Sequence, residues 1–525
     1  MEQVRKLPIG IQDFEKLRDE GYLYVDKSEY IYRLVHFGKH YFLSRPRRFG
    51  KSLFLSTLRA YWEGHAELFE GLKIVELEAG NKAAWKHYPV FYFDFNKKNF
   101  QRTTALEEVL DEHLRGWEAI YGAEDADKPL EERFRSLLVK AHEQTGHDCV
   151  VLADEYDKPL LEALPDSEIE EHNKAVFKGF FSTLKSYDHY LQFVFLTGVT
   201  KFSKVSIFSD LNHLNDISMN ADFSGICGIT QEELENNFAP EIESLAASNS
   251  FTRAECLAEL KRMYDGYHFS KQSEGIYNPF SLINAFYEKD FQCYWFETGT
   301  PTFLIKKLNQ IHFDARQFSS NDVYASDREL RDYRADNSNP VPLMYQTGYL
   351  TIQDYDRRRE RYALGYPNDE VKYAFIESLA PSYLHDTNGN GIDIFTFDDY
   401  IESGKLDGIR DIFISLFARL PYSADDTPKE RDFQNVIYIV FTLLGKYVHV
   451  ELHSAKGRAD CAVETENFIY IFEFKRDASA GEALAQIENS GYAAPYTADS
   501  RSLYKIGANF NSETRNLDGW EVHSA

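Results

Sequence analysis

Two carboxylates and a lysine near the C-terminal end of the chain have the types and spacing of a metal-dependent phosphodiester hydrolase. Asp460 is followed thirteen positions later by Glu473-Phe474-Lys475. Residues two apart on a strand share a face, so we expect Glu473 and Lys475 to project together. If Asp460 lies beside Glu473, the two charges repel by roughly 4 kcal/mol at about 4 Å and an effective dielectric near 20. A hard cation such as Mg²⁺, or Mn²⁺ in its place, relieves that repulsion.

The flanking sequence supplies the elements that must hold these side chains. Alternating apolar and polar residues predict a strand before Asp460, a strand that carries it and a strand that carries Glu473. Longer periodicities predict one helix that opens with Glu430 and another that carries Gln486. The outer strands are expected over 447–453 and 467–475, and the helices over 430–444 and 480–490.

Gly457-Arg458-Ala459-Asp460, Glu473-Phe474-Lys475 and Gln486 together resemble the PD-(D/E)XK nuclease superfamily. The resemblance implies a restriction-endonuclease-like α/β domain in which Asp460 and Glu473 bind the metal. It also implies that Lys475 positions or activates the attacking water, that Glu430 adds a metal ligand and that Gln486 supports the site.

Other interpretations of this region stay open. A Glu-x-Lys pair on a strand is often a solvated salt bridge, and a nuclease-derived fold can also lose its activity. Glu451 is a rival metal ligand. His449 and His453 share its strand face, although exposed histidines on an alternating strand explain them more simply than a transition-metal site does.

A phosphate-binding loop is predicted near the other end of the chain. An apolar strand over 41–43 runs into a basic loop, and an amphipathic helix begins directly after it. Backbone N–H groups at a helix start attract phosphate, Lys51 can reach the terminal phosphates, and the Ser52 hydroxyl can ligate Mg²⁺. Arg45 stands where such loops usually have their first glycine. We expect the nucleotide to contact Arg47, Arg48, Phe49, Gly50, Lys51 and Ser52, although the two arginines can instead face solvent.

Two further strands complete a predicted P-loop ATPase core. The strand over 149–153 ends in Asp154-Glu155, which supplies a metal-side aspartate and a glutamate that orients the attacking water. The strand over 191–196 ends in Thr197, whose hydroxyl we expect to sense the γ-phosphate. The alternative is that Thr197 and Thr200 only cap the strand.

Five longer motifs extend through the first half of the chain. They are Leu7-Pro8-Ile9-Gly10-Ile11-Gln12-Asp13-Phe14, Tyr24-Val25-Asp26-Lys27, the loop from Arg45 to Ser52, Asp154-Glu155-Tyr156-Asp157-Lys158-Pro159 and Tyr264-Asp265-Gly266-Tyr267. Together they closely resemble the bacterial AAA-ATPase-like family, whose members typically carry a C-terminal PD-(D/E)XK nuclease domain. The resemblance spans essentially the whole chain and implies an ATPase joined to a nuclease module.

Length and composition agree with such a layout. The chain has 525 residues, of which 43% are hydrophobic and 15% aromatic, as in globular rather than disordered proteins. We predict three domains: an AAA-like P-loop ATPase core at 1–235, a helical lid and winged-helix-like region at 236–390, and a PD-(D/E)XK nuclease-like domain at 391–525.

The cysteines and the apolar segments indicate a cytoplasmic protein. The five cysteines show neither paired nor metal-site spacing, which favours a reducing compartment and no zinc site. No signal peptide is visible, and no apolar run approaches the roughly 20 residues that span a bilayer. We therefore expect no membrane partner.

Net charge restricts how a nucleic acid can bind. The chain carries −26, and residues 400–525 hold 13 Lys and Arg against 19 Asp and Glu. Because DNA affinity comes largely from Lys and Arg, contact with DNA must be local, transient, metal-bridged or gated. A hairpin predicted around Arg357, Arg358 and Arg359 resembles a winged-helix wing that touches the DNA backbone. A solvated, charged turn is the alternative.

Taken together, the motifs predict an ATP-controlled, Mg²⁺-dependent DNA endonuclease. The alternative is a nucleotide-driven switch or scaffold whose inactive nuclease fold binds a protein or a nucleic acid. A homo-oligomer is also open, because many P-loop ATPases complete their sites with an arginine from a neighbouring subunit.

Overall fold

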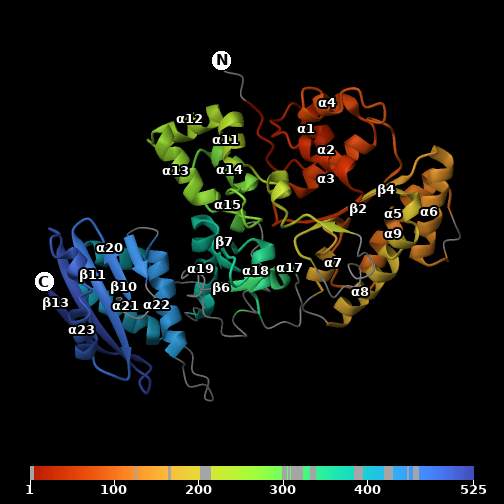
Figure 1. Ribbon diagram of the computed structural model, residues 1–525. Coiled ribbons are helices and arrows are strands. Elements are labelled where there is room, and N and C mark those ends of the chain that lie inside the picture. Colours follow the sequence, from red (N-terminus) through yellow and green to blue (C-terminus); the bar gives the residue numbers. More distant parts are fainter. Residues whose placement is uncertain are drawn as a thin grey trace. The chain divides into compact units, whose positions relative to one another are not determined.

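The computed structural model describes residues 5–123, 127–163, 167–201, 214–297, 304, 308, 323–331, 339–383, 394–418, 430–445, 449–452 and 460–524. These residues form two compact units, one from 1–299 and 324–370 and the other from 300–323 and 371–525 (Figure 1). The predicted ATPase core, helical region and hairpin therefore belong to one compact unit. The finer division predicted at residues 235 and 390 stays a prediction.

A parallel five-stranded sheet lies at the centre of the first unit, in the order β2-β3-β4-β1-β5. Its strands are β1 (His40–Ser44), β2 (Val90–Asp94), β3 (Cys149–Asp154), β4 (Leu191–Gly198) and β5 (Asn215–Asp216). The three predicted strands of the ATPase core are confirmed as β1, β3 and β4. Because all strands are parallel, the phosphate loop after β1 and the acidic pair at the end of β3 lie at the same edge of the sheet. β4 lies between these two strands.

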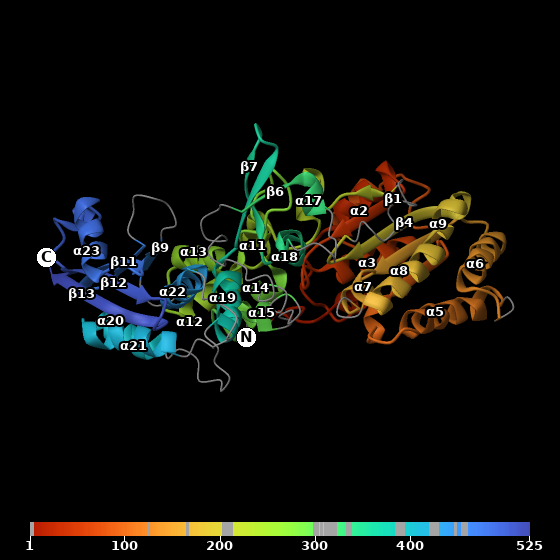
Figure 2. The ribbon, with the colours of Figure 1, turned by 90° about the horizontal axis from the view of Figure 1, so that it is seen from below.

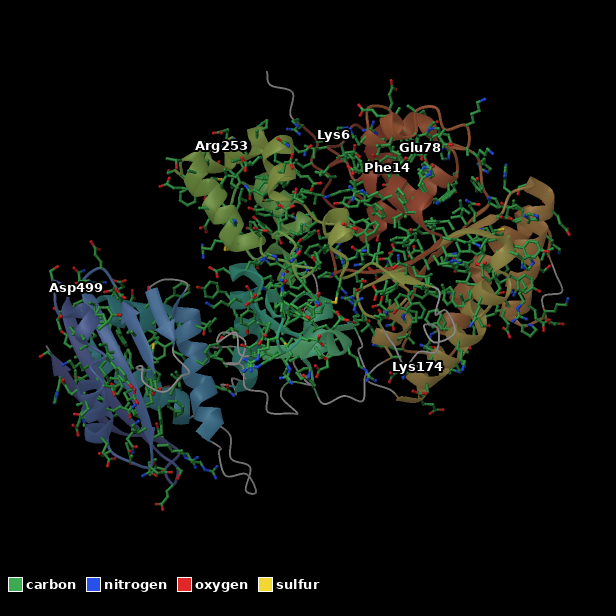
Figure 3. All side chains as sticks on the ribbon, viewed as in Figure 1. Lys6, Phe14, Glu78, Lys174, Arg253 and Asp499 are labelled. Atoms are coloured by element: carbon green, nitrogen blue, oxygen red, sulfur yellow. The ribbon has the colours of Figure 1, made fainter. Side chains whose placement is uncertain are left out.

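Helices surround this sheet, and α3, α5 and α6 contact its strands (Figure 1). The helices up to β4 are α1 (Phe14–Asp19), α2 (Ser28–Phe37), α3 (Lys51–Trp62), α4 (Lys73–Leu77), α5 (Ala105–Tyr121), α6 (Leu130–Thr145), α7 (Lys158–Leu161), α8 (Ser167–Phe181) and α9 (Thr183–Ser186). Phe14, labelled in Figure 3, closes the N-terminal motif and is fully buried against the rings of Tyr24 and Phe69. That contact anchors the N-terminal segment on the ATPase core.

The predicted helical region follows the sheet in sequence. Its described helices are α11 (Gln231–Asn237), α12 (Ala239–Ser248), α13 (Arg253–Tyr264), α14 (Pro279–Glu288) and α15 (Tyr294–Glu297). Thr230 and Thr252 start α11 and α13 with complete capping boxes, in which the threonine oxygen accepts from a backbone N–H and a glutamate returns the contact. No described helix of the chain is long and apolar enough to cross a membrane.

A small three-stranded sheet in the order β6-β8-β7 completes the first unit. The elements here are β6 (Val323–Ser326), α17 (Asp327–Arg331), α18 (Val341–Thr347), β7 (Thr351–Asp356), β8 (Arg361–Gly365) and α19 (Asp369–Tyr383), which continues into the residues of the second unit. β7 and β8 form the predicted antiparallel hairpin, and it extends outward in Figure 2.

The second unit contains a mixed five-stranded sheet in the order β13-β12-β11-β10-β9. The strands are β9 (His449–Leu452), β10 (Cys461–Glu464), β11 (Phe468–Arg476), β12 (Ser502–Asn511) and β13 (Asn516–Ser524), and the helices are α20 (Ile394–Glu402), α21 (Leu406–Ala418), α22 (Glu430–Leu444) and α23 (Ala480–Asn489). Among the described strands of this sheet, only β11 and β12 pair in parallel, and α23 lies between them in sequence. The predicted helices and outer strands of this region are confirmed.

The two faces of β11 pack against different layers. Ile469 and Ile471 lie under α23, beside Leu484 and Ile487. On the opposite face, Phe472 and Phe474 join an aromatic cluster with Phe441 of α22 and Phe413 of α21. Figure 2 shows α23 on one side of the sheet and α20 and α21 on the other. Because Glu473 and Lys475 continue the alternation of Ile469 and Ile471, they project toward the α23 side.

The close approach of α23 to β12 depends on Gly507, which gives a first prediction. A Cβ atom at position 507 would lie 2.2 Å from the Ala480 carbonyl oxygen and 2.8 Å from the Leu484 backbone nitrogen. Gly507→Ala is therefore expected to cost about 1–3 kcal/mol by overpacking. Hydrogen exchange of the full chain should show about tenfold faster exchange, or more, over β11, β12 and α23.

Gly481→Ala in α23 is the matched control. Its nearest neighbour would be the Glu521 carboxylate at 3.5 Å, an ordinary contact, and alanine favours a helix by up to about 1 kcal/mol over glycine. Unchanged exchange in Gly507→Ala would contradict the packing described for α23.

Candidate nucleotide and nuclease sites

The loop after β1 is shaped to begin a helix at the edge of the sheet. Arg48 and Gly50 both adopt left-handed backbone conformations, with φ of 66° and 91°, and α3 starts directly afterwards at Lys51. Lys51 is buried, and its ammonium donates hydrogen bonds to the carbonyl oxygens of Arg45 and Pro46, each at 3.0 Å. The lysine thus reaches across its own loop, where it can exchange these carbonyls for phosphate oxygens.

Ser52 and Asp154 meet beside this loop although they lie far apart in the sequence. The Ser52 side chain lies close enough to the Asp154 carboxylate to lower its pKa. Asp154 is 2% exposed, and its Oδ1 has no hydrogen-bond partner among the described residues. Burial and the neighbouring Glu155 raise the pKa of Asp154 to about 6, against the opposing effects of Ser52 and Lys51. A hydroxyl and a carboxylate oxygen are suitable ligands for Mg²⁺.

A cavity of about 600 Å³ opens in front of Lys51 and Ser52 and is large enough for a nucleotide. Glu155 reaches it from a sharp turn after β3, where its own φ is 48°. The cavity is lined by the phosphate-loop residues Arg47, Arg48, Gly50, Lys51, Ser52 and Leu53, by Pro8, Gly10, Ile11 and Gln12, by Asn96, Glu155, Lys158 and Glu162, and by Pro279, Phe280 and Ile283 of α14. It therefore combines a phosphate-binding side with apolar side chains that suit a base.

Arg45 holds the phosphate loop from behind. It is 1% exposed, its guanidinium donates to the carbonyls of Ser44, Ser218 and Phe223, and it lies 3.9 Å from the centre of the Phe269 ring. Burial lowers the pKa of this guanidinium. Position 45 is thus a structural anchor, and it needs no glycine because the left-handed conformations fall elsewhere in the loop.

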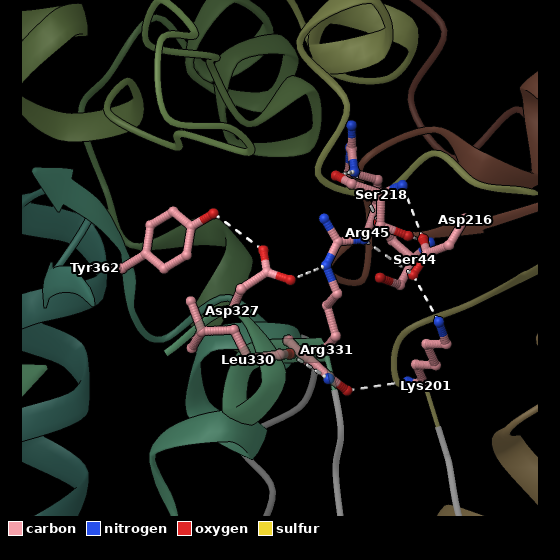
Figure 4. A network of polar contacts seen from close by, with 10 residues as sticks. Ser44, Arg45, Lys201, Asp216, Ser218, Asp327, Leu330, Arg331 and Tyr362 are labelled. Carbon is pink, nitrogen blue, oxygen red and sulfur yellow. Dashed lines mark hydrogen bonds and ion pairs between the residues drawn. The ribbon is translucent and has the colours of Figure 1, made fainter. Parts of the chain in front are cut away.

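The polar contacts continue from this anchor toward the small sheet (Figure 4). Asp216 accepts from the Ser218 backbone N–H at 3.0 Å and pairs with Lys201 at 2.8 Å and with Arg331 at 3.6 Å. Arg331 also pairs with Asp327 at 2.6 Å, and that carboxylate accepts from the hydroxyl of Tyr362 on β8. Although burial opposes it, Lys201 helps to keep the pKa of Asp216 low.

The nuclease residues converge at the end of β11. Asp460 Oδ2 accepts from the Phe474 backbone N–H at 2.9 Å, which places that carboxylate beside β11. Lys475 Nζ donates to Glu473 Oε1 at 3.0 Å and also to Gln486 Oε1 on α23. Gln486 in turn donates to the Tyr492 hydroxyl at 3.4 Å. The four predicted residues therefore form one cluster.

Glu473 is the buried carboxylate of this cluster. It is 2% exposed, and its Oε2 has no hydrogen-bond partner among the described residues. Burial raises the pKa of Glu473, and the charge of Asp460 adds to the shift while Lys475 opposes it. A divalent cation fits this pair, because it compensates two neighbouring carboxylates that the single ammonium of Lys475 does not neutralise.

Two comparisons with known proteins agree with this geometry. Residues 8–208 match the family model described as Predicted AAA-ATPase, and residues 428–520 match the PD-(D/E)XK nuclease superfamily. The chain is also 36% identical over 532 residues to the "Uncharacterized protein in vnfD 5'region" of Azotobacter chroococcum mcd 1, with 99% of each chain covered. The chain belongs to the AAA-ATPase-like family with a C-terminal PD-(D/E)XK nuclease domain.

Two residues predicted to bind nucleotide are turned away from the cavity of this AAA-ATPase-like protein. The Phe49 side chain is buried edge-on against Tyr267 and Phe269, so only its backbone remains to contact a ligand. The Thr197 hydroxyl is fully buried and donates to the Leu43 carbonyl of β1 at 2.9 Å. These contacts favour the strand-capping alternative for Thr197 over a γ-phosphate sensor.

The third ligand predicted for the nuclease domain is not described. The side chains of Glu430, His449 and Glu451, and residues 453–459, lie outside the part of the chain that the structure describes. Within the described part, no group of three or more His, Cys, Asp and Glu side chains could hold a metal. The candidate metal sites therefore consist of Ser52 with Asp154 and of Asp460 with Glu473.

The hairpin arginines have the exposure that a nucleic-acid contact needs. Arg357, Arg358 and Arg359 occupy the turn between β7 and β8 and are all exposed. Arg359 lies 3.4 Å from Asp356 in a loose ion pair. Both a DNA contact and a solvated turn are compatible with this arrangement.

Sequence reasoning missed several residues of these sites. Tyr492 extends the Lys475–Gln486 contact, and Phe280 and Ile283 line the nucleotide cavity. Pro8, Gly10, Ile11 and Gln12 also line it, and the N-terminal motif that contains them had pointed to this segment without a catalytic role.

Because burial raises the pKa of Asp154, the stability of the metal-free protein should depend on pH. A carboxyl with a folded pKa near 6 and an ordinary value of 3.8 destabilises the fold as pH rises between these values. Above about pH 6 the full penalty, on the order of 3 kcal/mol, is present. Asp154→Asn should therefore raise the urea midpoint of metal-free protein strongly at pH 8 and about half as much at pH 5.

The exposed Asp19 provides the control, because Asp19→Asn should change stability by less than about 0.5 kcal/mol at either pH. An equal gain for Asp154→Asn at pH 5 and pH 8, or no gain at pH 8, would contradict the burial argument.

Proposed function

We propose that this AAA-ATPase-like protein binds and hydrolyses ATP in its first unit and cleaves DNA phosphodiester bonds in its PD-(D/E)XK domain. Both sites would use Mg²⁺ or Mn²⁺, and the nucleotide state would control the nuclease. One observation carries the proposal. In each unit a buried carboxylate keeps an oxygen without a hydrogen-bond partner among the described residues, namely Asp154 Oδ1 and Glu473 Oε2. Such an oxygen is costly to bury unless a cation binds it.

In the ATPase unit, different residues of the cavity would bind the phosphates, the cation and the attacking water. Lys51 and the loop N–H groups bind the β- and γ-phosphates, and Arg47 and Arg48 add positive charge at the cavity wall. Ser52 and Asp154 would hold the cation, which neutralises phosphate charge when bound. Glu155, which reaches the same cavity, orients the attacking water and accepts hydrogen bonds from it.

In the nuclease unit, Asp460 and Glu473 would hold the cation, which supplies Lewis acidity at the scissile phosphate when bound. Lys475 holds the attacking water beside that phosphate. Gln486 positions the lysine by accepting a hydrogen bond from its ammonium. The Gln486 amide is held in turn by its hydrogen bond to the Tyr492 hydroxyl. Glu430 remains the proposed additional ligand.

A chain of contacts in the first unit supports control by nucleotide. The Trp295 indole N–H donates to the Arg47 carbonyl of the phosphate loop at 2.9 Å. The backbone N–H of the same tryptophan donates at 2.7 Å to Glu370, which is fully buried at the start of α19. Because α19 continues into the second unit's residues, a shift of the loop has a covalent route toward the nuclease domain.

The acidic composition favours a second candidate function, a nucleotide-driven switch whose nuclease fold binds a partner without cutting. A net charge of −26 opposes tight DNA binding. In that case the domain has no chemical need for Lys475 between a buried glutamate and Gln486.

Digestion of supercoiled and linear DNA by the full chain with Mg²⁺ or Mn²⁺, in the presence and absence of ATP, tests the nuclease. Lys475→Ala should slow cleavage by about 100-fold or more, as expected for the loss of a group that assists the nucleophile. Lys505→Ala is the matched control, because Lys505 pairs with Glu488 away from the cluster.

Metal binding separates the two candidate functions. Titration calorimetry should detect a cation site that Asp460→Ala removes and Lys475→Ala retains. No cleavage under any condition, together with no Asp460-dependent metal binding, would favour the switch over the nuclease.

A further inference from the structure

Asp157, the residue after the Asp154–Tyr156 turn, is held in place by the two residues that follow β4. Asp157 is 1% exposed, and its carboxylate accepts from the Val199 backbone N–H at 3.1 Å and from the Thr200 backbone and hydroxyl at 2.5 and 2.7 Å. The Tyr156 hydroxyl adds a hydrogen bond to the Thr200 carbonyl at 2.9 Å. Burial raises the pKa of Asp157, and the Thr200 contacts oppose that shift. The turn that follows β3 is therefore held rigidly on the tip of the neighbouring strand.

This lock fixes the start of α7 at Lys158. The Lys158 backbone N–H donates to the Glu155 carbonyl at 3.0 Å, so the two residues belong to one tight turn. The side chains of Glu155 and Lys158 both line the cavity that Lys51 and Ser52 line. A positive charge is thus placed beside the glutamate that is proposed to orient water.

The ammonium of Lys158 has donor capacity left for a ligand. It donates to the Asn96 carbonyl at 3.0 Å and lies 3.9 Å from Glu162, at a side-chain exposure of 20%. An ammonium carries three N–H donors, and the carbonyl uses one of them. The distance to Glu162 is too long for a hydrogen bond.

Lys51 and Arg48, two of the three other cations that line the cavity, have different surroundings. Lys51 reaches over the loop carbonyls, and the Arg48 guanidinium packs 5.1 Å from the ring centre of Phe280 on α14, among the apolar lining. Charge that develops on the transferred γ-phosphate needs a cation beyond the loop lysine, supplied by the same chain or by a neighbour. Lys158 is the cation of the described lining that stands in the same turn as Glu155.

We propose that Lys158 is a catalytic residue that donates to the γ-phosphate in the transition state, within the same chain. The proposal rests on ATP hydrolysis as the function of the first unit. Its consequence is that one chain holds a complete hydrolytic site. Hydrolysis then requires no arginine from a second subunit, whatever the oligomeric state.

The test measures ATP affinity and turnover of the full chain for wild type, Lys158→Ala, Lys158→Arg and Lys174→Ala. Lys174, labelled in Figure 3, pairs with Glu170 and Glu171 on α8 outside the cavity and serves as the control. Lys158→Ala should lower kcat by about 100-fold, the scale for one transition-state donor. Nucleotide affinity should stay within about threefold, and Lys158→Arg should recover part of kcat because it keeps the charge.

The dependence on protein concentration gives a second readout. Wild-type turnover per chain should stay constant over a hundredfold dilution if the site is complete in one chain. Turnover of Lys158→Ala within twofold of wild type, or a rate per chain that rises with concentration, would overturn the proposal. Nucleotide binding by Lys158→Ala demonstrates that the variant is folded.

The failure of this proposal is distinguishable from failure of the function on which it rests. Wild-type protein that neither binds nor hydrolyses ATP overturns both. Wild-type hydrolysis that Lys158→Ala retains overturns only the role of Lys158.

Discussion

The buried guanidinium of Arg45 is the interaction on which the first unit depends. A charge taken out of water is stabilised by hydrogen bonds to its donors, and here Nη1 and Nη2 of Arg45 donate to three carbonyls while the Phe269 ring lies against the guanidinium. These partners come from three separate parts of the chain, at Ser44, at 218–223 and at Phe269. The phosphate loop is consequently held from behind while Lys51, Ser52 and the loop N–H groups stay directed at the cavity.

Contacts that begin at Arg45 join the ATPase sheet to the rest of the first unit. Asp216 continues the contacts from Ser218 to Lys201, which follows β4, and to Arg331 at the end of α17. On the other side of the loop, Trp295 bonds to the Arg47 carbonyl. The helices, the hairpin and the sheet belong to one compact unit. A structural change at the phosphate loop can therefore be transmitted to each of them through these contacts. The nuclease cluster has its own support, from α23 on one face of β11 and the aromatic layer on the other.

Local patterns predicted much of this arrangement. Alternation along β11 placed Glu473 and Lys475 on one face, and the apolar periodicity of α22 gave its range, because both signals depend on near neighbours. Strand order could not be predicted in the same way, since the position of β4 between β1 and β3 follows from long-range pairing. Phe49 and Thr197 were predicted from their motif positions to contact nucleotide. The Phe49 side chain instead packs in the core, and the Thr197 hydroxyl donates a hydrogen bond to the neighbouring strand. The role of Arg45 was also hidden, because its partners are more than 170 residues distant apart from Ser44.

Control of the nuclease by the nucleotide site is tested by cleavage of supercoiled DNA by full-length wild type and Lys51→Ala, each with ATP, with ADP and with no nucleotide. Lys51 and Lys475 belong to different compact units, so Lys51→Ala leaves the nuclease cluster intact. We expect wild-type cleavage to depend on the nucleotide, and Lys51→Ala to remove this dependence without removing Asp460-dependent metal binding. Equal cleavage by both proteins under all three conditions would contradict this control.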